Sequence, residues 1–291
     1  MKIYFMLAFT RETLNPNPVL VELFETLRRQ GHEVELGVAN ELVMDPGQFT
    51  AQHDLYILKS HTALWLSLAG ILHSQGARIL NPYSACLAAH DKIVAERLLE
   101  AAGIPTPHSW VTGDLGLLRP LCEERALVVK PYIGGRGRGV VIAHNPYELA
   151  AIPTPDQPLL AQEYIPGDEI KVAVIGQTVA AIRKIETPAG SIRVPCEVSS
   201  EVREIALKCG RVFGLGMYGL DVILGADGPV VIDLNYFPSY KGVPNAAALL
   251  ARYILDNASA YAHSSFSAET RDASRSGVRR QAASYAFAQV G

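Results

Sequence analysis

Two kinds of apolar pattern alternate along the first 82 residues, and this alternation constrains the fold more than any other feature of the chain. Strand-like runs lie at 2–9, 32–38, 54–60 and 77–82, and runs with helical spacing lie at 18–30 and 63–75. Gly31 and Gly76 end the two helical runs. Strands that alternate with helices are typical of a parallel, doubly wound sheet, so we expect an α/β domain over residues 1–82.

The pattern changes in the middle of the chain. A helical run at 84–102 is followed by strand-like runs with tight turns at 126–135, 138–144, 158–165 and 169–186. A helix at 199–213, two strands at 219–224 and 229–236, and a helix at about 245–257 complete the pattern. This succession predicts an antiparallel α+β region. The tail at 262–291 is rich in Ser, Ala and Arg and lacks apolar periodicity, so we expect it to be poorly ordered.

The composition excludes several classes of protein. The formal net charge is −3, so no basic excess indicates nucleic acid or an anionic membrane as a partner. No apolar run is long enough to span a membrane, and the N-terminal run lacks the small-residue cleavage site of a signal peptide. The four cysteines share no short metal-type spacing, which favours inert thiols in a cytoplasmic protein over a zinc site.

A pair of expected strands near residue 230 carries the most specific local signal. Asp233 and Asn235 are two residues apart on one strand and therefore point to the same face. A three-residue turn at 226–228, with its glycine in the left-handed conformation, would place Asp221 opposite Asp233. Facing carboxylates repel unless a cation lies between them, and two acids with an amide oxygen suit Mg²⁺. We therefore predict a magnesium site here, against the plainer interpretation of a solvent-facing strand side.

Other residues are suited to binding phosphate. Lys130 ends an apolar strand, where a cation should have an anionic partner. The glycine-rich segment 134–139 can present backbone N–H groups to an anion, and its two arginines add charge. A G-x-G-x-x-G pattern at 214–219 follows a helix and precedes a strand, which is the reverse of the dinucleotide-binding order. We interpret that pattern as a helix stop and a turn.

Taken in order, these motifs resemble the ATP-grasp superfamily over residues 1–257. The motifs are Lys92 before Gly-Ile-Pro-Thr-Pro at 103–107, Lys130, the glycine loop, Gln162-Glu163-Tyr164-Ile165, and Asp221 with Asp233-x-Asn235. The resemblance implies an N-terminal domain at 1–82, a central lobe at 83–165 and a C-terminal lobe at 166–261. The two α+β lobes would grip ATP between them.

The resemblance also implies a site for ATP and Mg²⁺. The expected phosphate contacts are Lys92, Lys130, Gly134, Gly135, Arg136 and Gly137, and the expected adenine contacts are Gln162, Glu163, Tyr164 and Ile165, with Glu169 near the ribose. The expected metal ligands are Asp221, Asp233 and Asn235, and the expected catalytic residues are Lys130 and Arg183, which matches an arginine that steadies the transferred phosphate. Many ATP-grasp ligases carry Glu where this chain has Asp233, so the geometry of the ligands departs from the family.

Two subgroups of the superfamily differ in the acceptor of the phosphoryl group, and the sequence leaves both possible. The glycine loop and the 103–107 segment resemble the ligases that glutamylate ribosomal protein, which make an acyl phosphate that an amine converts to an amide. The segment that begins at Asp233 resembles inositol trisphosphate kinases, which phosphorylate an alcohol and lack such a loop. The intact loop favours the ligase. A non-catalytic nucleotide-binding protein is a third alternative, which the full set of lysines and metal ligands disfavours.

The ligase hypothesis and the kinase hypothesis both predict a small anionic substrate. The residues expected to face it are Lys59, Arg136, Arg138, Lys171, Arg193 and Lys241, and we expect about half of them to be solvated surface charges instead. Specificity is expected in loops at 10–18, 59–65, 186–197 and 236–245. A homo-oligomer is compatible with the family, although no heptad pattern or interface stripe indicates one.

Overall fold

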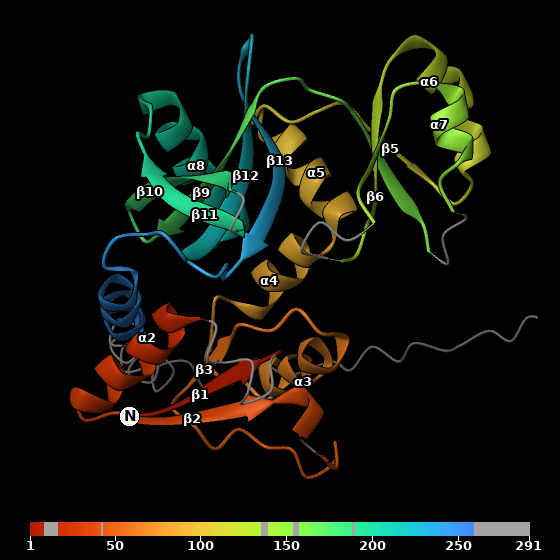
Figure 1. Ribbon diagram of the computed structural model, residues 1–291. Coiled ribbons are helices and arrows are strands. Elements are labelled where there is room, and N and C mark those ends of the chain that lie inside the picture. The colour runs from red at the N-terminus through yellow and green to blue at the C-terminus, as the bar shows by residue number, and fades with distance from the viewer. Residues whose placement is uncertain (9–16, 42, 135–138, 154–156, 188–189, 259–291) are drawn as a thin grey trace, which may run out of the picture. The chain divides into compact units, whose positions relative to one another are not determined.

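The computed structural model describes residues 1–8, 17–41, 43–134, 139–153, 157–187 and 190–258. The chain divides into two compact units, Met1–Tyr253 and Ile254–Gly291, and the first unit carries three β-sheets (Figure 1). Residues 246–258 are helical, close to the expected helix, and the tail at 262–291 lies outside the described residues.

The domain boundaries expected at residues 82, 165 and 261 stay predictions. No helix in the described ranges combines the length and the apolar character needed to cross a membrane.

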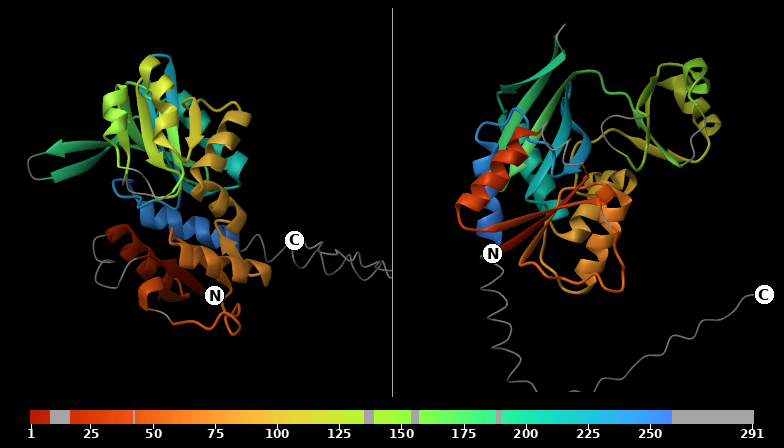
Figure 2. Two further views of the ribbon diagram at one scale, coloured as in Figure 1. Left: turned by 90° about the vertical axis from the view of Figure 1, so that its right-hand side faces the viewer. Right: turned by 60° about the horizontal axis from the view of Figure 1, so that its bottom comes forward.

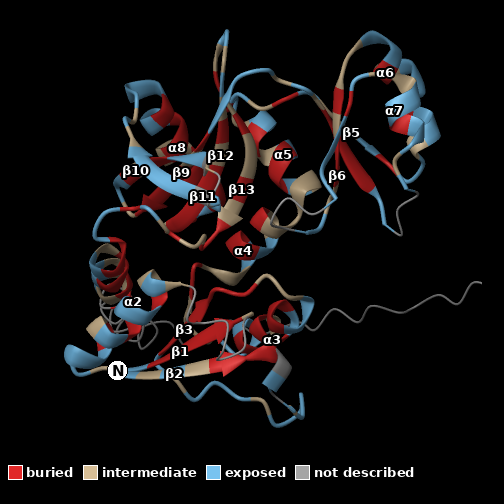
Figure 3. Ribbon diagram, viewed as in Figure 1, coloured by how far each residue is buried: buried red, intermediate tan, exposed pale blue. Residues whose placement is uncertain are grey.

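The first sheet confirms the predicted doubly wound pattern. Its strands are β1 (Lys2–Leu7), β2 (Glu33–Val38), β3 (Leu55–Leu58) and β4 (Ile79–Leu80), all parallel in the order β2-β1-β3-β4. The helices α2 (Pro18–Arg29) and α3 (Ala63–Ser74) and the short 3-10 helix η1 (Ala39–Glu41) connect them. The apolar stripe of α2 is buried, and β1 and β3 are buried along almost their whole length (Figure 3).

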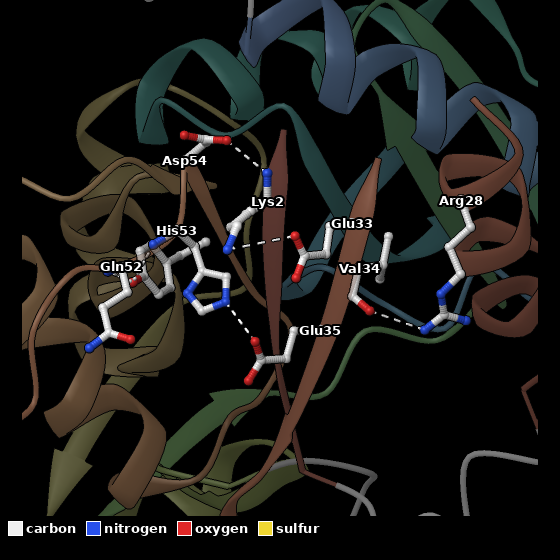
Figure 4. Close-up of polar contacts among 9 residues, drawn as sticks. Lys2, Arg28, Glu33, Val34, Glu35, Gln52, His53 and Asp54 are labelled. Carbon is white, nitrogen blue, oxygen red and sulfur yellow. Dashed lines mark hydrogen bonds and ion pairs between the residues drawn. The ribbon is translucent and has the colours of Figure 1, made fainter. Parts of the chain in front are cut away.

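The amino-terminal end of this sheet carries polar contacts at its surface (Figure 4). Lys2 forms an ion pair with Glu33 at 3.7 Å, and His53 Nε2 lies 2.8 Å from Glu35 Oε2. Most of these side chains are well exposed, so each pair contributes little to stability. The parallel strands direct their other ends toward the remaining sheets, where the Asn81 side chain after β4 binds the backbone of Met217.

The expected helix at 84–102 is two helices in the structure. The helix α4 (Tyr83–His90) ends at Asp91, and α5 (Lys92–Ala101) begins directly after it. The Asp91 carboxylate accepts hydrogen bonds from the backbone N–H groups of Ile93 and Val94, which makes Asp91 the N-cap of α5. This correction matters for the site, because the cap places Lys92 at the start of a helix.

The central sheet is antiparallel, with the order β5-β8-β6-β7. Its strands are β5 (Ser109–Thr112), β6 (Leu127–Pro131), β7 (Val141–Ala143) and β8 (Leu159–Glu163). One face packs on η2 (Leu115–Leu118), α6 (Arg119–Glu124) and α7 (Pro146–Ala150), around a core that includes Leu127, Val129 and Ala161. The sequence predicted β6, β7 and β8 but neither β5 nor these short helices.

The third sheet has the order β11-β10-β9-β12-β13 and is antiparallel. Its strands are β9 (Asp168–Ile175), β10 (Thr178–Thr187), β11 (Gly190–Cys196), β12 (Met217–Gly225) and β13 (Gly228–Tyr236), and α8 (Ser200–Phe213) packs on one face. Gly214 ends α8 with a φ of 71°, which confirms the predicted helix stop.

The expected loop at 186–197 is largely the strand β11. Pro195 has no N–H to donate, so the sequence around it did not indicate a strand. β11 is an edge strand, where proline is tolerated. Residues 183–187 of β10 pair only with β11, so the two strands project beyond the rest of the sheet (Figure 2).

We predict that Gly167 is required by a close backbone approach. A Cβ added at Gly167 would lie 2.4 Å from the carbonyl oxygen of Leu224, and the φ of Gly167 is 156°. The Gly167→Ala variant should lose about 3 kcal/mol or more of unfolding free energy in urea titrations. The matched control is Gly214→Ala, where nothing lies within 4 Å and the loss should be about 1 kcal/mol. Equal losses in the two variants would contradict the close approach.

Candidate active site

A β-bulge between β12 and β13 builds the centre of the candidate site. The two strands pair from Gly225–Gly228 to Val222–Val231, and the register then shifts so that Asp221 faces Asp233. The connecting turn has two residues instead of the expected three, and Ile232 is the extra residue that restores the predicted pairing of the acids. The predicted juxtaposition of Asp221 and Asp233 is therefore confirmed, although by a different turn.

The bulge also supplies a partner for Lys130. The Lys130 ammonium donates a hydrogen bond to the carbonyl of Ile232 at 2.8 Å, and its side chain is only 6% exposed. Burial lowers the pKa of Lys130, while the carboxylates of Asp233 and Glu96 oppose that shift. The expected anionic partner is thus nearby, but the direct contact is a backbone carbonyl. A cation of the central sheet is held against the hairpin of the third sheet.

Charged residues form a row across one face of the third sheet. Lys171 of β9 lies opposite Asp221 of β12, which lies opposite Asp233 of β13. Lys171 Nζ is 2.8 Å from Asp221 Oδ2 and 3.1 Å from Glu169 Oε1. Burial and the neighbouring Asp233 raise the pKa of Asp221 to about 6, although Lys171 opposes the shift. Burial alone would lower the pKa of Lys171, but the carboxylates of Asp221 and Glu169 raise that pKa overall.

The predicted magnesium ligands fit a hard cation in part. One face of the sheet carries Asp221, Asp233 and Asn235. Asn235 lies two residues after Asp233 on β13, and its partner Gly219 lies two residues before Asp221 on β12, so the Asn235 side chain points to the face of the two acids. Within the described ranges no group of three or more His, Cys, Asp or Glu side chains is arranged to hold a metal ion. A cation bound here would therefore complete its shell with the amide of Asn235 and with phosphate oxygens or water, as Mg²⁺ commonly does. Lys171 already balances part of the acidic charge.

The helix α5 brings the other predicted lysine to the same region. Lys92 is the first residue of α5, and its Nζ donates to the carbonyl of Gly134 at 2.8 Å. Its backbone N–H donates to the carbonyl of Tyr132 at 3.1 Å. The start of the glycine loop is therefore fixed beside Lys92. The rest of that predicted loop, Gly135, Arg136, Gly137 and Arg138, lies outside the described residues.

The segment predicted to meet adenine has one side chain with a different role. Gln162 is 2% exposed, and its amide donates to the Glu96 carboxylate at 2.8 Å, so it supports the strand and does not offer its side chain to a ligand. The Glu163 side chain is 37% exposed and lies 4.0 Å from Arg125. Tyr164 and Ile165 follow β8, whereas Glu169 pairs with Lys171. Contact of this segment with adenine stays a prediction.

The strand register places Arg183 away from the predicted phosphate site. Ile182 lies opposite Lys171, so Ile182 shares the face of the two acids and Arg183 points to the other face. Arg183 instead pairs with Asp168 at 3.3 Å. Lys184, the next residue, returns to the face of the acids and lies opposite Arg193. Lys184, and not Arg183, is therefore the basic residue of β10 on the face of the two acids, and a contact of Arg183 with the transferred phosphate stays a prediction.

Three predicted substrate residues lie in or beside the segment that follows β13. Lys59 follows β3, is 7% exposed, and lies with its Nζ 5.4 Å from the ring centroid of Phe237. The segment that carries Lys241 passes close to Arg193, because a Cβ added at Gly242 would lie 3.1 Å from Arg193 Cβ. Phe237, Tyr240 and Asn245 in this segment have positive φ angles of 54°, 55° and 50°. Such strain is often stored at binding sites.

Two histidines near Lys59 and Lys92 were not predicted. His61 stacks on Tyr236 with ring centroids 4.0 Å apart, and His90 lies 6.1 Å from His61. The Tyr236 hydroxyl donates to the carbonyl of Ser60 at 2.6 Å. Burial, with Lys59 and His90 nearby, lowers the pKa of His61 to about 3. No local motif marks either histidine, because their partners are distant in sequence.

We predict that His61 makes the stability of the protein sensitive to acid. Its folded pKa of about 3 lies below the ordinary value of 6.5, so the unfolded chain binds the extra proton as the pH falls below 6.5. The wild type should therefore lose up to about 2 kcal/mol more unfolding free energy between pH 7 and pH 5 than the His61→Phe variant. Urea unfolding at both pH values measures the difference. The exposed His73→Phe variant should keep the wild-type pH dependence, and an unchanged dependence in His61→Phe would contradict the prediction.

Solved structures define the class of protein to which this fold belongs. A RimK domain ATP-grasp protein from Sphaerobacter thermophilus matches with a TM-score of 0.71 and 20% identity, covering 88% of this chain and 100% of that protein. D-alanine–D-alanine ligase from Bacillus anthracis, solved with ATP, matches with a TM-score of 0.70 and 19% identity, covering 89% of this chain and 97% of that protein. The chain therefore has the ATP-grasp fold, as predicted.

Sequence comparison identifies the family. Residues 89–255 match the RimK-like ATP-grasp domain, and the chain belongs to this family. A probable alpha-L-glutamate ligase from Stenotrophomonas maltophilia is 30% identical over 198 residues, which cover 60% of this chain and 66% of that relative. The matched stretch thus spans just under two thirds of the relative's length. The predicted resemblance to the glutamate ligase group is confirmed.

Proposed function

We propose that this protein is an ATP- and Mg²⁺-dependent carboxylate–amine ligase that acts through an acyl phosphate on a small anionic substrate. The observation that best supports this proposal is the hydrogen bond of 2.8 Å between Lys130 and the carbonyl of Ile232. It holds a buried cation directly beside Asp233, on the strand that carries two of the proposed metal ligands. Transfer of a phosphoryl group depends mainly on such positioning and charge neutralisation.

The proposed reaction has two steps. A carboxylate oxygen of the acceptor attacks the γ-phosphorus of ATP, and the bond to ADP breaks. An amine then attacks the acyl carbon, the carbon–oxygen bond to phosphate breaks, and the nitrogen loses a proton as the amide forms. Lys130 and Lys92 would hold the phosphates during the first step, because the Lys130 ammonium group joins the central and third sheets and the Lys92 ammonium group lies at the start of the glycine loop.

The metal ligands and the basic residues would divide the remaining work. Mg²⁺ held by Asp221, Asp233 and Asn235 would neutralise charge on the phosphate oxygens. Lys184 would lie beside the transferred phosphate, and Lys171 would orient Asp221 through their contact of 2.8 Å. Lys59, Arg193 and Lys241 would face the acceptor, and the name of the glutamate ligase relative supports an acidic amino acid as one of the substrates.

Trapping with hydroxylamine tests the proposed intermediate. The protein should release ADP and form a hydroxamate when it is incubated with ATP, Mg²⁺, pooled carboxylic acids and hydroxylamine. Hydroxylamine attacks an acyl phosphate but leaves an alcohol phosphate intact. ADP release together with only a stable phosphate ester would make the protein a kinase, and nucleotide binding without turnover would make it non-catalytic.

Substitution of Asp233 tests the metal site. Asp233→Asn keeps the size of the side chain but removes a charge that the cation needs, so the Mg²⁺-dependent rate should fall about 100-fold or more. The control Asp227→Ala changes an exposed carboxylate in the turn of the same hairpin and should keep the wild-type rate. Full activity of Asp233→Asn would show that the metal assignment is wrong.

Neighbouring basic residues on β10 test which cation acts on the transferred phosphate. Lys184→Gln should lower kcat by about 100-fold, because it removes a charge that acts on the phosphate in the transition state. Arg183→Gln, on the opposite face, should change kcat by less than about threefold. Steady-state ADP release measures both, and the reverse ranking would restore the original prediction for Arg183.

A further inference from the structure

A carboxylate is buried beside the proposed ATP site without contacting the proposed ligands of metal or phosphate. Glu96, in the second turn of α5, is 8% exposed and is the only acidic residue among the described residues that is buried to this extent. Carboxylates are rarely buried unless specific partners compensate the loss of water. The partners of Glu96 therefore indicate what this residue does.

Each carboxylate oxygen of Glu96 accepts one hydrogen bond. The Thr106 hydroxyl donates to Oε2 at 2.5 Å, and the Gln162 amide donates to Oε1 at 2.8 Å. Gln162 also lies 3.3 Å from the Ser109 hydroxyl. Glu96 thus joins α5 to the end of β8, where the proposed adenine segment begins, and to the connector between α5 and β5.

The same connector is bound to the metal hairpin. The carbonyl of Pro105, next to Thr106, accepts a hydrogen bond of 2.8 Å from the backbone N–H of Val231 in β13. Ile232, the following residue, presents its carbonyl to Lys130. Two consecutive residues at the bulge are therefore bonded to the connector and to the proposed phosphate lysine.

Electrostatics link Glu96 to Lys130 as well. Burial raises the pKa of Glu96, and its two hydrogen bonds and the nearby Lys130 ammonium oppose that rise. In the opposite direction, the Glu96 charge helps to keep the buried Lys130 protonated. The two residues are coupled although no hydrogen bond joins them directly.

We propose that Glu96 is a positioning residue for ATP, which sets Lys130 and the adenine segment relative to the metal hairpin. This inference rests on the proposed function, because it assumes that ATP binds between the central and third sheets. Glu96 touches neither nucleotide nor metal in this arrangement. It acts on Lys130 through its charge, and on the adenine segment and the hairpin through Gln162 and Thr106.

Binding of a nucleotide provides a test that needs no knowledge of the acceptor. We would measure the Kd of a non-hydrolysable ATP analogue with Mg²⁺ by calorimetry on the full chain, at a temperature where each variant is folded. Glu96→Gln removes the charge but keeps the shape, and it should weaken binding about tenfold. The matched control Glu100→Ala removes a carboxylate one turn further along α5, which is 63% exposed and pairs with Arg97, and it should leave the Kd unchanged.

A double-mutant cycle separates positioning from a merely structural role. If Glu96 acts through Lys130, Glu96→Gln should weaken binding by less than about threefold in a Lys130→Met background. Additive effects on Kd would overturn the proposal, as would a wild-type Kd for Glu96→Gln. Thr106→Val removes one hydrogen bond to the carboxylate and provides a second variant, which should weaken binding in the same direction. Absence of analogue binding by the wild type would overturn the proposed function itself, and with it this inference.

Discussion

The buried ammonium of Lys130 imposes the strongest constraint on this structure. A cation with 6% exposure must replace its water, and the carbonyl of Ile232 at 2.8 Å supplies the replacement. That carbonyl is available because the bulge makes Ile232 an extra residue in the ladder with β12. The same bulge turns Asp233 to the face of Asp221. One irregularity in a hairpin therefore holds the lysine of the central sheet and pairs the acids of the third.

Charge on the face of the third sheet is balanced across neighbouring strands. Lys171 lies between Glu169 and Asp221, so the acids of this face are partly neutralised before any ligand binds. Burial raises the pKa of Asp221 in spite of Lys171, so this carboxylate keeps a cost of burial that a bound cation would reduce. A divalent cation would add positive charge beside the acids, and the phosphates of ATP would add negative charge beside the lysines. Together they would balance the charge on this face. The arrangement is thus suited to binding the two together.

Several contacts between separate parts of the fold use backbone groups as one or both partners. Asn81 binds the backbone of Gly216 and Met217, Tyr236 donates to the carbonyl of Ser60, and Val231 donates to the carbonyl of Pro105. Each bond satisfies a polar group that would otherwise be costly to bury. These bonds also fix where the strands end relative to one another. Two of the strands that they connect, β12 and β13, carry the proposed metal ligands Asp221, Asp233 and Asn235.

The sequence by itself predicted that Asp221 faces Asp233, although the bulge at Ile232 that produces this pairing came only from the structure. It also determined most of the elements and the order of the motifs, because these depend on periodicities that neighbouring residues carry. The buried stripe of α2 and the alternation along β13 are of this kind. Only the tertiary structure decided that Lys184, and not Arg183, shares the face of the acids, since that depends on the pairing of Ile182 with Lys171. It also decided that Gln162 turns inward to Glu96, that His61 stacks on Tyr236, and that Lys130 binds a carbonyl 102 residues away. Partners so distant in the chain leave no local pattern, because folding alone brings them together.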